Sequence, residues 1–426
     1  MRNDIEVPDS QPSWLYKGWP STGQSIHLDD LVLQQRNLFR DDFLFPVATI
    51  SATDLDHNID TMSRFCDEHG VSLAPHAKTT MSPEIIDRQL AAGAWGITAS
   101  TASQAQVFRR FGVERILIAH QVVDPAAVRW LSHELNNNPE VEIICLVDSI
   151  AAIEAMERAL ANAPHGRELA VLVELGFAGG RSGCRTIDEA IAVAKAADVS
   201  PRLRLVGVEG YEGIVPTQGD DYSALDDFIL RLGALATRLD ELGLFDRLDE
   251  ILITAGGSMF PDRVVALLGG GPHLSKPSRL VIRSGCYVTH DSAFYEEGAP
   301  FGVREPMTSY PPLHAAMRVW SYVVSRPQPD LVLLGFGKRD ASYDVDLPKP
   351  LEVRRDGEVR QVDGELNVFS LNDQHAYVRV AQGFDIAVGD VVACGISHPC
   401  TTFDKWRAIP LVDEDFTVVG VVRTFF

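Results

Sequence analysis

The sequence has few cysteines for its 426 residues, and no two of them form a Cys-x-x-Cys pair. The six are scattered along the chain, at Cys66, Cys145, Cys184, Cys286, Cys394 and Cys400. Secreted domains that depend on disulfide bonds are denser in cysteine, whereas a sparse pattern is typical of reduced thiols. We therefore expect a cytoplasmic protein without a disulfide framework.

Long hydrophobic runs and positive charge are also scarce. No run approaches the roughly 18 apolar residues of a transmembrane helix, and residues 1–27 lack the apolar core of a signal peptide. The 38 lysines and arginines are outnumbered by 59 aspartates and glutamates, so the formal net charge is −21. A field of this sign repels phosphate backbones and anionic lipids, so neither nucleic acid nor a membrane is expected as a partner.

The composition, with 46% hydrophobic and 23% charged residues, is that of a globular protein with a sizeable core. A chain of this length exceeds one ordinary core, so two domains are expected. Eight short runs rich in Val, Ile and Leu have the character of buried parallel strands. They cover residues 73–76, 95–98, 115–119, 141–147, 169–174, 203–210, 250–254 and 280–283.

Segments with helical spacing lie between these runs, among them residues 82–92, 102–111, 149–161 and 188–197. Alternating strands and helices imply βαβ units. A doubly wound open sheet has a similar pattern, but eight strands in this span favour a (β/α)8 TIM barrel.

Beyond residue 283, prolines cluster and short alternating runs replace the βαβ pattern. These runs predict antiparallel strands at residues 317–325, 330–334, 352–360, 376–380, 390–393 and 417–424. Residues 46–51 precede the first barrel strand and are expected to pair with these strands. The expected domains are therefore a cofactor-binding barrel at 52–295 and a β domain formed by 1–51 and 296–426.

Lys78 follows the first expected barrel strand, and the strand ends of such barrels carry the functional groups. A lysine at such a place is most often a solvated surface residue. Here apolar residues precede it, and the small hydroxyl residues Thr79 and Thr80 follow where a bulky solvated loop would be expected. Lys78 is therefore a candidate nucleophile or cofactor anchor.

Glycine-containing loops follow the seventh and eighth strands, the usual phosphate site of these barrels. They read Ala-Gly-Gly-Ser at 255–258 and Ser-Gly-Cys-Tyr at 284–287. Glycines let backbone N–H groups approach an anion, and Ser258 and Tyr287 add hydroxyl donors. A lysine that faces a phosphate cradle predicts a Schiff base to a phosphorylated aldehyde.

His398 and Cys400 form a His-x-Cys pair, whose side chains point to one face of an extended segment. Imidazole and thiolate are good zinc ligands. Two ligands are too few for a closed structural site. The pair is either an open catalytic metal site, completed by water or substrate, or a turn histidine beside a buried thiol.

Six motifs occur in order: Pro-His-Ala-Lys-Thr-Thr (75–80), Gly-Ala-Trp-Gly-Ile-Thr-Ala-Ser-Thr (93–101), Gly-Val-Glu-Gly-Tyr-Glu-Gly (207–213), Ala-Gly-Gly-Ser (255–258), Arg-Ser-Gly-Cys-Tyr (283–287) and Ser-His-Pro-Cys-Thr-Thr (397–402). Together they resemble the D-serine dehydratase and D-threonine aldolase family, within the alanine-racemase-like fold type of pyridoxal-phosphate enzymes. The resemblance runs from about residue 46 to the C-terminus. The residues before it match no pattern.

This resemblance implies a barrel with a C-terminal β domain, assembled as a homodimer. It also implies that Lys78 bears pyridoxal 5'-phosphate, with Arg181 near the ring hydroxyl, and that His398 and Cys400 hold a divalent metal, expected to be zinc. The other residues implied at the cofactor are His76, Tyr211, Gly256, Gly257, Ser258, Gly285, Cys286 and Tyr287. Either Tyr211 or Arg283 faces the ring nitrogen, with Tyr211 favoured. Gln104 departs from the family, where an acidic residue is expected.

The implied reaction is that of a D-serine dehydratase, which converts a D-β-hydroxy amino acid to a keto acid and ammonia. Lys78 would remove the α-proton as general base, and the metal would activate the β-hydroxyl as a Lewis acid. A D-threonine-type aldolase, giving glycine and an aldehyde, is the alternative; the His-x-Cys form favours the dehydratase. A non-catalytic pyridoxal-phosphate carrier would lack the β domain and the metal pair.

Overall fold

The computed structural model describes residues 13–20, 27–164, 166–219, 221–301 and 310–426. The described chain divides into two compact units. The barrel unit comprises residues 63–78 and 89–285, and the β unit comprises residues 13–62, 79–88 and 286–426, apart from the gaps just given. No helix of the described residues is long and apolar enough to span a membrane.

The barrel unit contains one sheet of eight parallel strands, in the order β2-β9-β8-β7-β6-β5-β4-β3. Their bounds are β2 Ser72–Leu73, β3 Ile97–Ala99, β4 Arg115–Gln121, β5 Glu142–Val147, β6 Leu169–Leu175, β7 Leu203–Gly210, β8 Ile251–Ala255 and β9 Ser278–Ile282. A parallel bridge between His76 and Thr98 joins the two ends of this order and closes the ring. The predicted (β/α)8 barrel is therefore confirmed, with a strand at each of the eight predicted runs.

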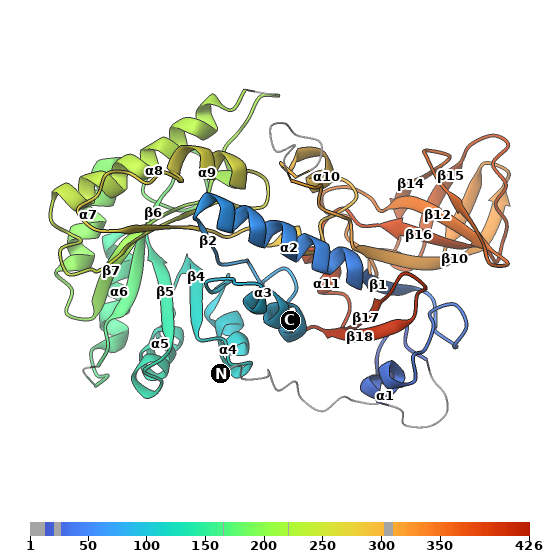
Figure 1. Ribbon diagram of the computed structural model, residues 1–426, viewed down its shortest axis with the longest axis horizontal. Helices are drawn as coiled ribbons and strands as arrows, with labels where there is room; N and C mark the ends of the chain where they lie inside the picture. The colour runs from blue at the N-terminus through green and yellow to red at the C-terminus, as the bar shows by residue number, and fades with distance from the viewer. Residues whose placement is uncertain (1–12, 21–26, 165, 220, 302–309) are drawn as a thin grey trace. The chain divides into compact units, whose positions relative to one another are not determined.

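Helices cover the outside of this sheet (Figure 1). Six lie within the barrel unit: α4 Ala102–Arg110, α5 Pro125–Asn137, α6 Ile150–Leu160, α7 Ile187–Asp198, α8 Ser223–Glu241 and α9 Pro261–Leu268. Side-chain caps begin several of them. Thr186, for example, accepts the backbone N–H of Glu189 at 3.2 Å in a capping box at the start of α7. Two further helices, α2 Ala52–His69 and α3 Pro83–Ala91, each contain a boundary between the units.

The β unit contains a ten-stranded sheet with the main order β13-β12-β16-β10-β1-β17-β18, and β11, β15 and β14 continue from β10. Its strands are β1 Val47–Ser51, β10 Met317–Gln328, β11 Leu331–Leu334, β12 Lys349–Arg355, β13 Glu358–Gln361, β14 Leu366–Leu371, β15 Ala376–Val380, β16 Val391–Gly395, β17 Ala408–Val412 and β18 Val418–Arg423. Strand β1 pairs with β10, as predicted for residues 46–51. All pairs are antiparallel except β1 with β17.

The run predicted as one strand at 352–360 is two strands, β12 and β13. A turn at Asp356 and Gly357 separates them, and both residues have positive φ, 51° and 87°. An Asp-Gly pair accepts such φ values and reverses the chain into a hairpin. The single-strand prediction was wrong because it passed over this turn.

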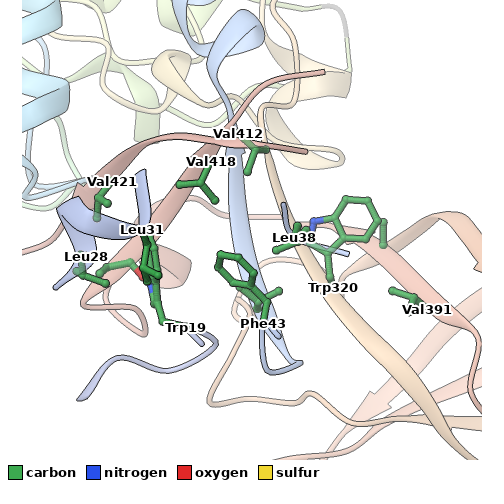
Figure 2. Packing of buried hydrophobic residues seen from close by; sticks show 13 residues of the cluster. Trp19, Leu28, Leu31, Leu38, Phe43, Trp320, Val391, Val412, Val418 and Val421 are labelled. Atoms are coloured by element: carbon green, nitrogen blue, oxygen red, sulfur yellow. The ribbon is translucent and has the colours of Figure 1, made fainter. Parts of the chain in front are cut away.

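The residues before the predicted resemblance help to build the core of the β unit. Trp19 and the short helix α1 (Leu28–Leu33) pack with Val421 of β18 (Figure 2). The indole of Trp19 donates to the backbone oxygen of Ala408 at 3.0 Å. Burying a leucine or a larger apolar side chain contributes about 1.5–3 kcal/mol, so this segment is a structural part of the unit.

Candidate functional site

Lys78 lies just past β2, at the end of the barrel unit's first strand segment. It is the one exposed residue between Leu73 and Pro83, a stretch that the structure describes completely. The backbone before Lys78 is hydrogen-bonded to the neighbouring strand segment, because Ala77 donates its N–H to the oxygen of Thr98 at 3.0 Å. A rigid, buried backbone therefore presents a single accessible amine.

His76 precedes Lys78 and has an unfilled polar atom. Its Nδ1 is buried and has no hydrogen-bond partner among the described residues. Burial, followed by the nearby charges of Lys78, Arg283 and Arg181, holds the pKa of His76 well below its usual range. The imidazole is therefore neutral, and it offers a polar atom to a ligand beside Lys78.

The two glycine loops lie side by side, as the barrel order requires. Ser284 donates its hydroxyl to the oxygen of Gly257 at 3.0 Å, and Gly285 donates its N–H to the hydroxyl of Ser258 at 3.1 Å. A Cβ at Gly257 would lie 2.9 Å from the ring of Tyr211, and one at Gly256, where φ is 85°, would lie 2.8 Å from Ile282. Both positions require glycine.

Glu212, which the sequence alone did not indicate as a site residue, holds this cradle. Its buried carboxylate accepts the N–H groups of Gly256 at 2.9 Å and of Gly257 at 2.6 Å. Two of the N–H groups expected at the phosphate are thus bound to a carboxylate in the structure. An acidic residue within the motif at 207–213 was the available signal.

The two candidates for the ring nitrogen have different surroundings. Arg181 places its guanidinium 5.1 Å from the ring of Tyr211. Arg283 is buried and donates to Glu209 at 2.5 Å and to the hydroxyl of Thr254 at 2.6 Å. Burial raises the pKa of Glu209 to about 8, against the opposing effect of Arg283. Arg283 is therefore charge-paired within the barrel.

The β unit brings the predicted metal pair together with two further side chains. Cys400, which opens the short helix α11 (Cys400–Phe403), lies 3.6 Å from the sulfur of Cys286 and 3.2 Å from the hydroxyl of Thr79. His398 forms a side-chain hydrogen bond with Cys400. Its Nδ1 lies 2.7 Å from a carboxylate oxygen of Asp344.

The charges of this cluster favour a thiolate beside an imidazolium. The Cys286 thiol, followed by the His398 imidazole, holds the pKa of Cys400 well below its usual range. The hydrogen bond with Cys400 raises the pKa of His398 to about 9. The hydrogen bond between Cys286 and Cys400 raises the pKa of Cys286, which stays a thiol. When His398 gives up its ring proton to a bound metal, the thiolate and the neutral imidazole form a donor set that suits zinc.

No group of three or more His, Cys, Asp and Glu side chains is placed to hold a metal among the described residues. A metal held by His398 and Cys400 alone would have an open coordination sphere. Asp344 supports the pair through His398, because its carboxylate contacts Nδ1 of that residue. The same carboxylate accepts a hydrogen bond from the hydroxyl of Thr401 at 2.7 Å. The sequence held no spacing signal for Asp344, 54 residues before His398.

The predicted site residues thus fall into two groups. The barrel unit holds His76, Lys78, Arg181, Tyr211, Gly256, Gly257, Ser258 and Gly285, and the β unit holds Cys286, Tyr287, His398 and Cys400. The chain passes from one unit to the other at the peptide bonds Lys78–Thr79 and Gly285–Cys286. Gln104 is turned to its own helix start, where its side-chain oxygen accepts the N–H of Ser100 at 2.8 Å.

Comparison with known proteins agrees with this organisation. Residues 50–240 match the alanine racemase N-terminal domain, and residues 316–412 match the putative serine dehydratase domain. A D-threonine aldolase of Arthrobacter sp. is 26% identical, over 87% of this chain and 89% of that protein. A D-threo-3-hydroxyaspartate dehydratase of Delftia sp. strain HT23 is 31% identical, over 58% of this chain and 61% of that protein.

Solved structures share the fold. A D-threonine aldolase from Filomicrobium marinum superposes with a TM-score of 0.74 at 23% identity and covers 90% of this chain and 95% of its own. The Delftia dehydratase superposes with a TM-score of 0.69 at 21% identity, covering 90% and 98%. Solved variants of that dehydratase replace a histidine, or a cysteine two positions later in a metal-free form. The predicted resemblance to this family is confirmed.

Proposed function

We propose that this chain, an alanine-racemase-like barrel joined to a serine dehydratase domain, is a pyridoxal-phosphate- and metal-dependent lyase of D-β-hydroxy amino acids. We assign it the dehydratase reaction, which releases a keto acid and ammonia, with D-serine as the simplest substrate. The observation that carries the assignment is the His398–Cys400 pair, held by Asp344 in the β unit. The residues replaced in the Delftia dehydratase have the same spacing, with one variant metal-free.

The barrel residues fit pyridoxal phosphate. Lys78 offers an accessible amine on a rigid backbone, and His76 offers a buried Nδ1 without a partner among the described residues. Gly256 and Gly257 donate their N–H groups to the carboxylate of Glu212, so the backbone of this loop is one that binds an anionic group. Bound there, the cofactor supplies the electron sink that makes the Cα proton of an amino acid acidic.

Lys78 then has two tasks at its Nζ atom: it anchors the cofactor, and, once released by the substrate, it takes the Cα proton as general base. Arg181 and the glycine loops orient the cofactor, and Arg181 adds positive charge against the chain's net charge of −21. His398 and Cys400 would hold a divalent metal, whose Lewis acidity assists departure of a β-hydroxyl. Because Lys78 and Thr79 are consecutive, and Thr79 contacts Cys400, we assign both groups to one reaction.

Aldol cleavage is the second candidate, because the Arthrobacter relative is a D-threonine aldolase. The two reactions need the same groups and differ in which bond breaks. Dehydration breaks the Cβ–O bond, whereas cleavage removes the hydroxyl proton and breaks the Cα–Cβ bond.

The test is to incubate the purified protein, with pyridoxal phosphate and zinc, with D-serine, D-threonine and the 3-hydroxyaspartate isomers. A dehydratase gives keto acid and ammonia in equal amounts, and an aldolase gives glycine and an aldehyde. The corresponding L-amino acids serve as controls. Cofactor binding without turnover of any of these substrates would contradict the proposal and favour a carrier protein.

A homodimer in the cytoplasm remains our expectation for the assembled protein. All six cysteines are free thiols in the structure. Light scattering on the cofactor-loaded protein measures its mass in solution, and a mass of one chain would contradict the dimer.

A further inference from the structure

A buried ion pair lies inside the barrel unit, close to the groups assigned to the cofactor. Glu209, on β7, is 2% exposed, and Arg283, just after β9, is 4% exposed. Arg283 donates to Oε1 of Glu209 at 2.5 Å. The second carboxylate oxygen, Oε2, is buried and has no hydrogen-bond partner among the described residues. Glu209 therefore presents an unfilled acceptor within the barrel.

The charged groups around this pair are balanced in sign. The cations are Lys78, Arg181 and Arg283, the carboxylates are Glu174, Glu209 and Glu212, and His76 is the neighbouring titratable group. The other two carboxylates are occupied on both oxygens. Glu174 accepts from Gln121 and Ser182, and Glu212 accepts from two backbone N–H groups. Of these three carboxylates, Glu209 is the one with a buried oxygen left open.

The groups of pyridoxal phosphate that Lys78 and the glycine loops would bind limit where its ring nitrogen can lie. The aldehyde carbon and the ring nitrogen lie at opposite ends of the pyridine ring, and the phosphate arm lies beside the aldehyde. Lys78 follows β2, and the glycine loops follow β9 and β8, the next two strands around the barrel. A cofactor held by Lys78 and these loops would place its ring nitrogen away from β2, on the side of β7 and β6 in the strand order. Glu209 belongs to β7.

Resting on the proposed function, we propose that Glu209 keeps the ring nitrogen of the bound cofactor protonated. Its carboxylate compensates the Arg283 guanidinium, which on its own would oppose a proton on a nearby nitrogen. A protonated ring nitrogen makes the cofactor a strong electron sink, which suits elimination. Glu209 influences the reaction only through the charge of the ring nitrogen. It is therefore a positioning residue and not a catalytic one.

The proton balance needs no further reactant. Burial raises the pKa of Glu209 to about 8, against the opposing effect of Arg283, so its carboxyl group gains and loses a proton near neutral pH. With the cofactor bound, the proton would lie on the ring nitrogen, and Oε2 of Glu209 would accept its hydrogen bond. The carboxylate that remains then lies between two positive charges, the guanidinium and the protonated ring. Both charges stabilise the anionic form, so the proton stays on the nitrogen.

The test loads the full-length protein with pyridoxal phosphate labelled with ¹⁵N in the ring and records its ¹⁵N spectrum at neutral pH. Protonated and unprotonated pyridine nitrogens give well-separated signals. We expect the protonated signal in the wild-type protein and a shift to the unprotonated signal in Glu209→Gln, which keeps the shape and removes the charge. Glu174→Gln is the matched control, because Glu174 is a buried carboxylate of the neighbouring strand; its signal should stay protonated.

Glu209→Asp keeps the negative charge, so its ring nitrogen should give the protonated signal. This second variant keeps the test decisive if Glu209→Gln folds poorly. Equal signals in the wild type and Glu209→Gln, with the cofactor bound, would overturn the role of Glu209 and leave the proposed function intact. A wild-type protein that does not take up the cofactor on Lys78 would instead overturn the proposed function at the loading step. The two failures are therefore distinct.

Discussion

The two units use different chemistry for their buried polar groups. The barrel unit buries charged groups whose contacts are made by nitrogen and oxygen atoms. An example is Arg283, which donates a hydrogen bond to Glu209. The β unit gathers soft groups instead, the thiols of Cys286 and Cys400 and the imidazole of His398. Guanidinium and backbone N–H groups suit a phosphorylated organic cofactor, whereas thiolate and imidazole suit a transition metal. The difference indicates that each unit supplies one part of the proposed reaction.

The largest effect is expected when the amine of Lys78 is removed from the barrel unit. Lys78→Ala should abolish the visible absorbance of the lysine-bound cofactor and reduce turnover by about a thousandfold or more, since one side chain both anchors the cofactor and moves the proton. Metal binding by the β unit should be unchanged. The matched control is Lys195→Ala, at an exposed position of α7. Labelling of another lysine by borohydride reduction would refute the assignment.

The converse change removes the soft ligand of the β unit. Cys400→Ala, or removal of metal with a chelator, should lower dehydratase turnover about a hundredfold or more, because hydroxide is a poor leaving group without a Lewis acid. The visible absorbance at Lys78 should remain, and added zinc should restore the chelated enzyme but not the variant. Cys394→Ala, which removes a buried thiol of the same unit, is the control. Full activity in Cys400→Ala would return the pair to a structural role.

The units also differ in how far the sequence predicts them. Strands buried on both faces of a parallel sheet are continuous apolar runs, and the runs predicted for the barrel all contain strands. The β unit was predicted less completely. Strand β17 contains Pro410, is buried throughout and does not alternate, so the period-two pattern missed it, and β14 was missed as well.

The site follows the same division. Lys78, the glycine loops and His398-x-Cys400 are local motifs, which spacing reveals. Asp344 is recognised by its contact with His398, 54 residues away, and Glu209 by its contact with Arg283, 74 residues away. Contacts between residues so far apart in the sequence depend on how the folded strands and loops align. A single sequence does not reveal that alignment.

A pH experiment examines the stability of the β unit. Burial lowers the pKa of His290 to about 4, and the charge of His314 acts in the same direction. Between about pH 6.5 and 4, His290 therefore binds a proton more readily in the unfolded chain than in the folded one. The free energy of unfolding falls as the pH falls through this window. The contribution is at most about 3 kcal/mol at neutral pH. It should vanish in His290→Asn, since asparagine tolerates the φ of 48° at this position.

Urea unfolding of wild type and variant at pH 7 and pH 4.5 measures this contribution. The wild type should lose more stability than His290→Asn on acidification. Asp291, whose pKa burial raises to about 6, titrates in the opposite sense but is common to both proteins and cancels. His273→Asn, at an exposed position of the barrel unit, should behave as wild type. Parallel pH curves for wild type and His290→Asn would contradict the prediction.

The smallest effect is expected at Asp344, which contacts the metal pair only through His398. Its carboxylate lies 2.7 Å from Nδ1 of His398, and this contact leaves Nε2 as the atom that meets a metal. Asp344→Asn keeps the shape but loses the charge, so zinc affinity measured by calorimetry should fall about 10- to 100-fold, with the Lys78 absorbance unchanged. Asp346→Asn, at a nearby exposed position, is the matched control, because among the described residues Asp346 is bound only through its backbone oxygen, by Ser397. Unchanged zinc affinity in Asp344→Asn, with His398→Ala binding none, would show that the pair holds its metal without help from the carboxylate behind it.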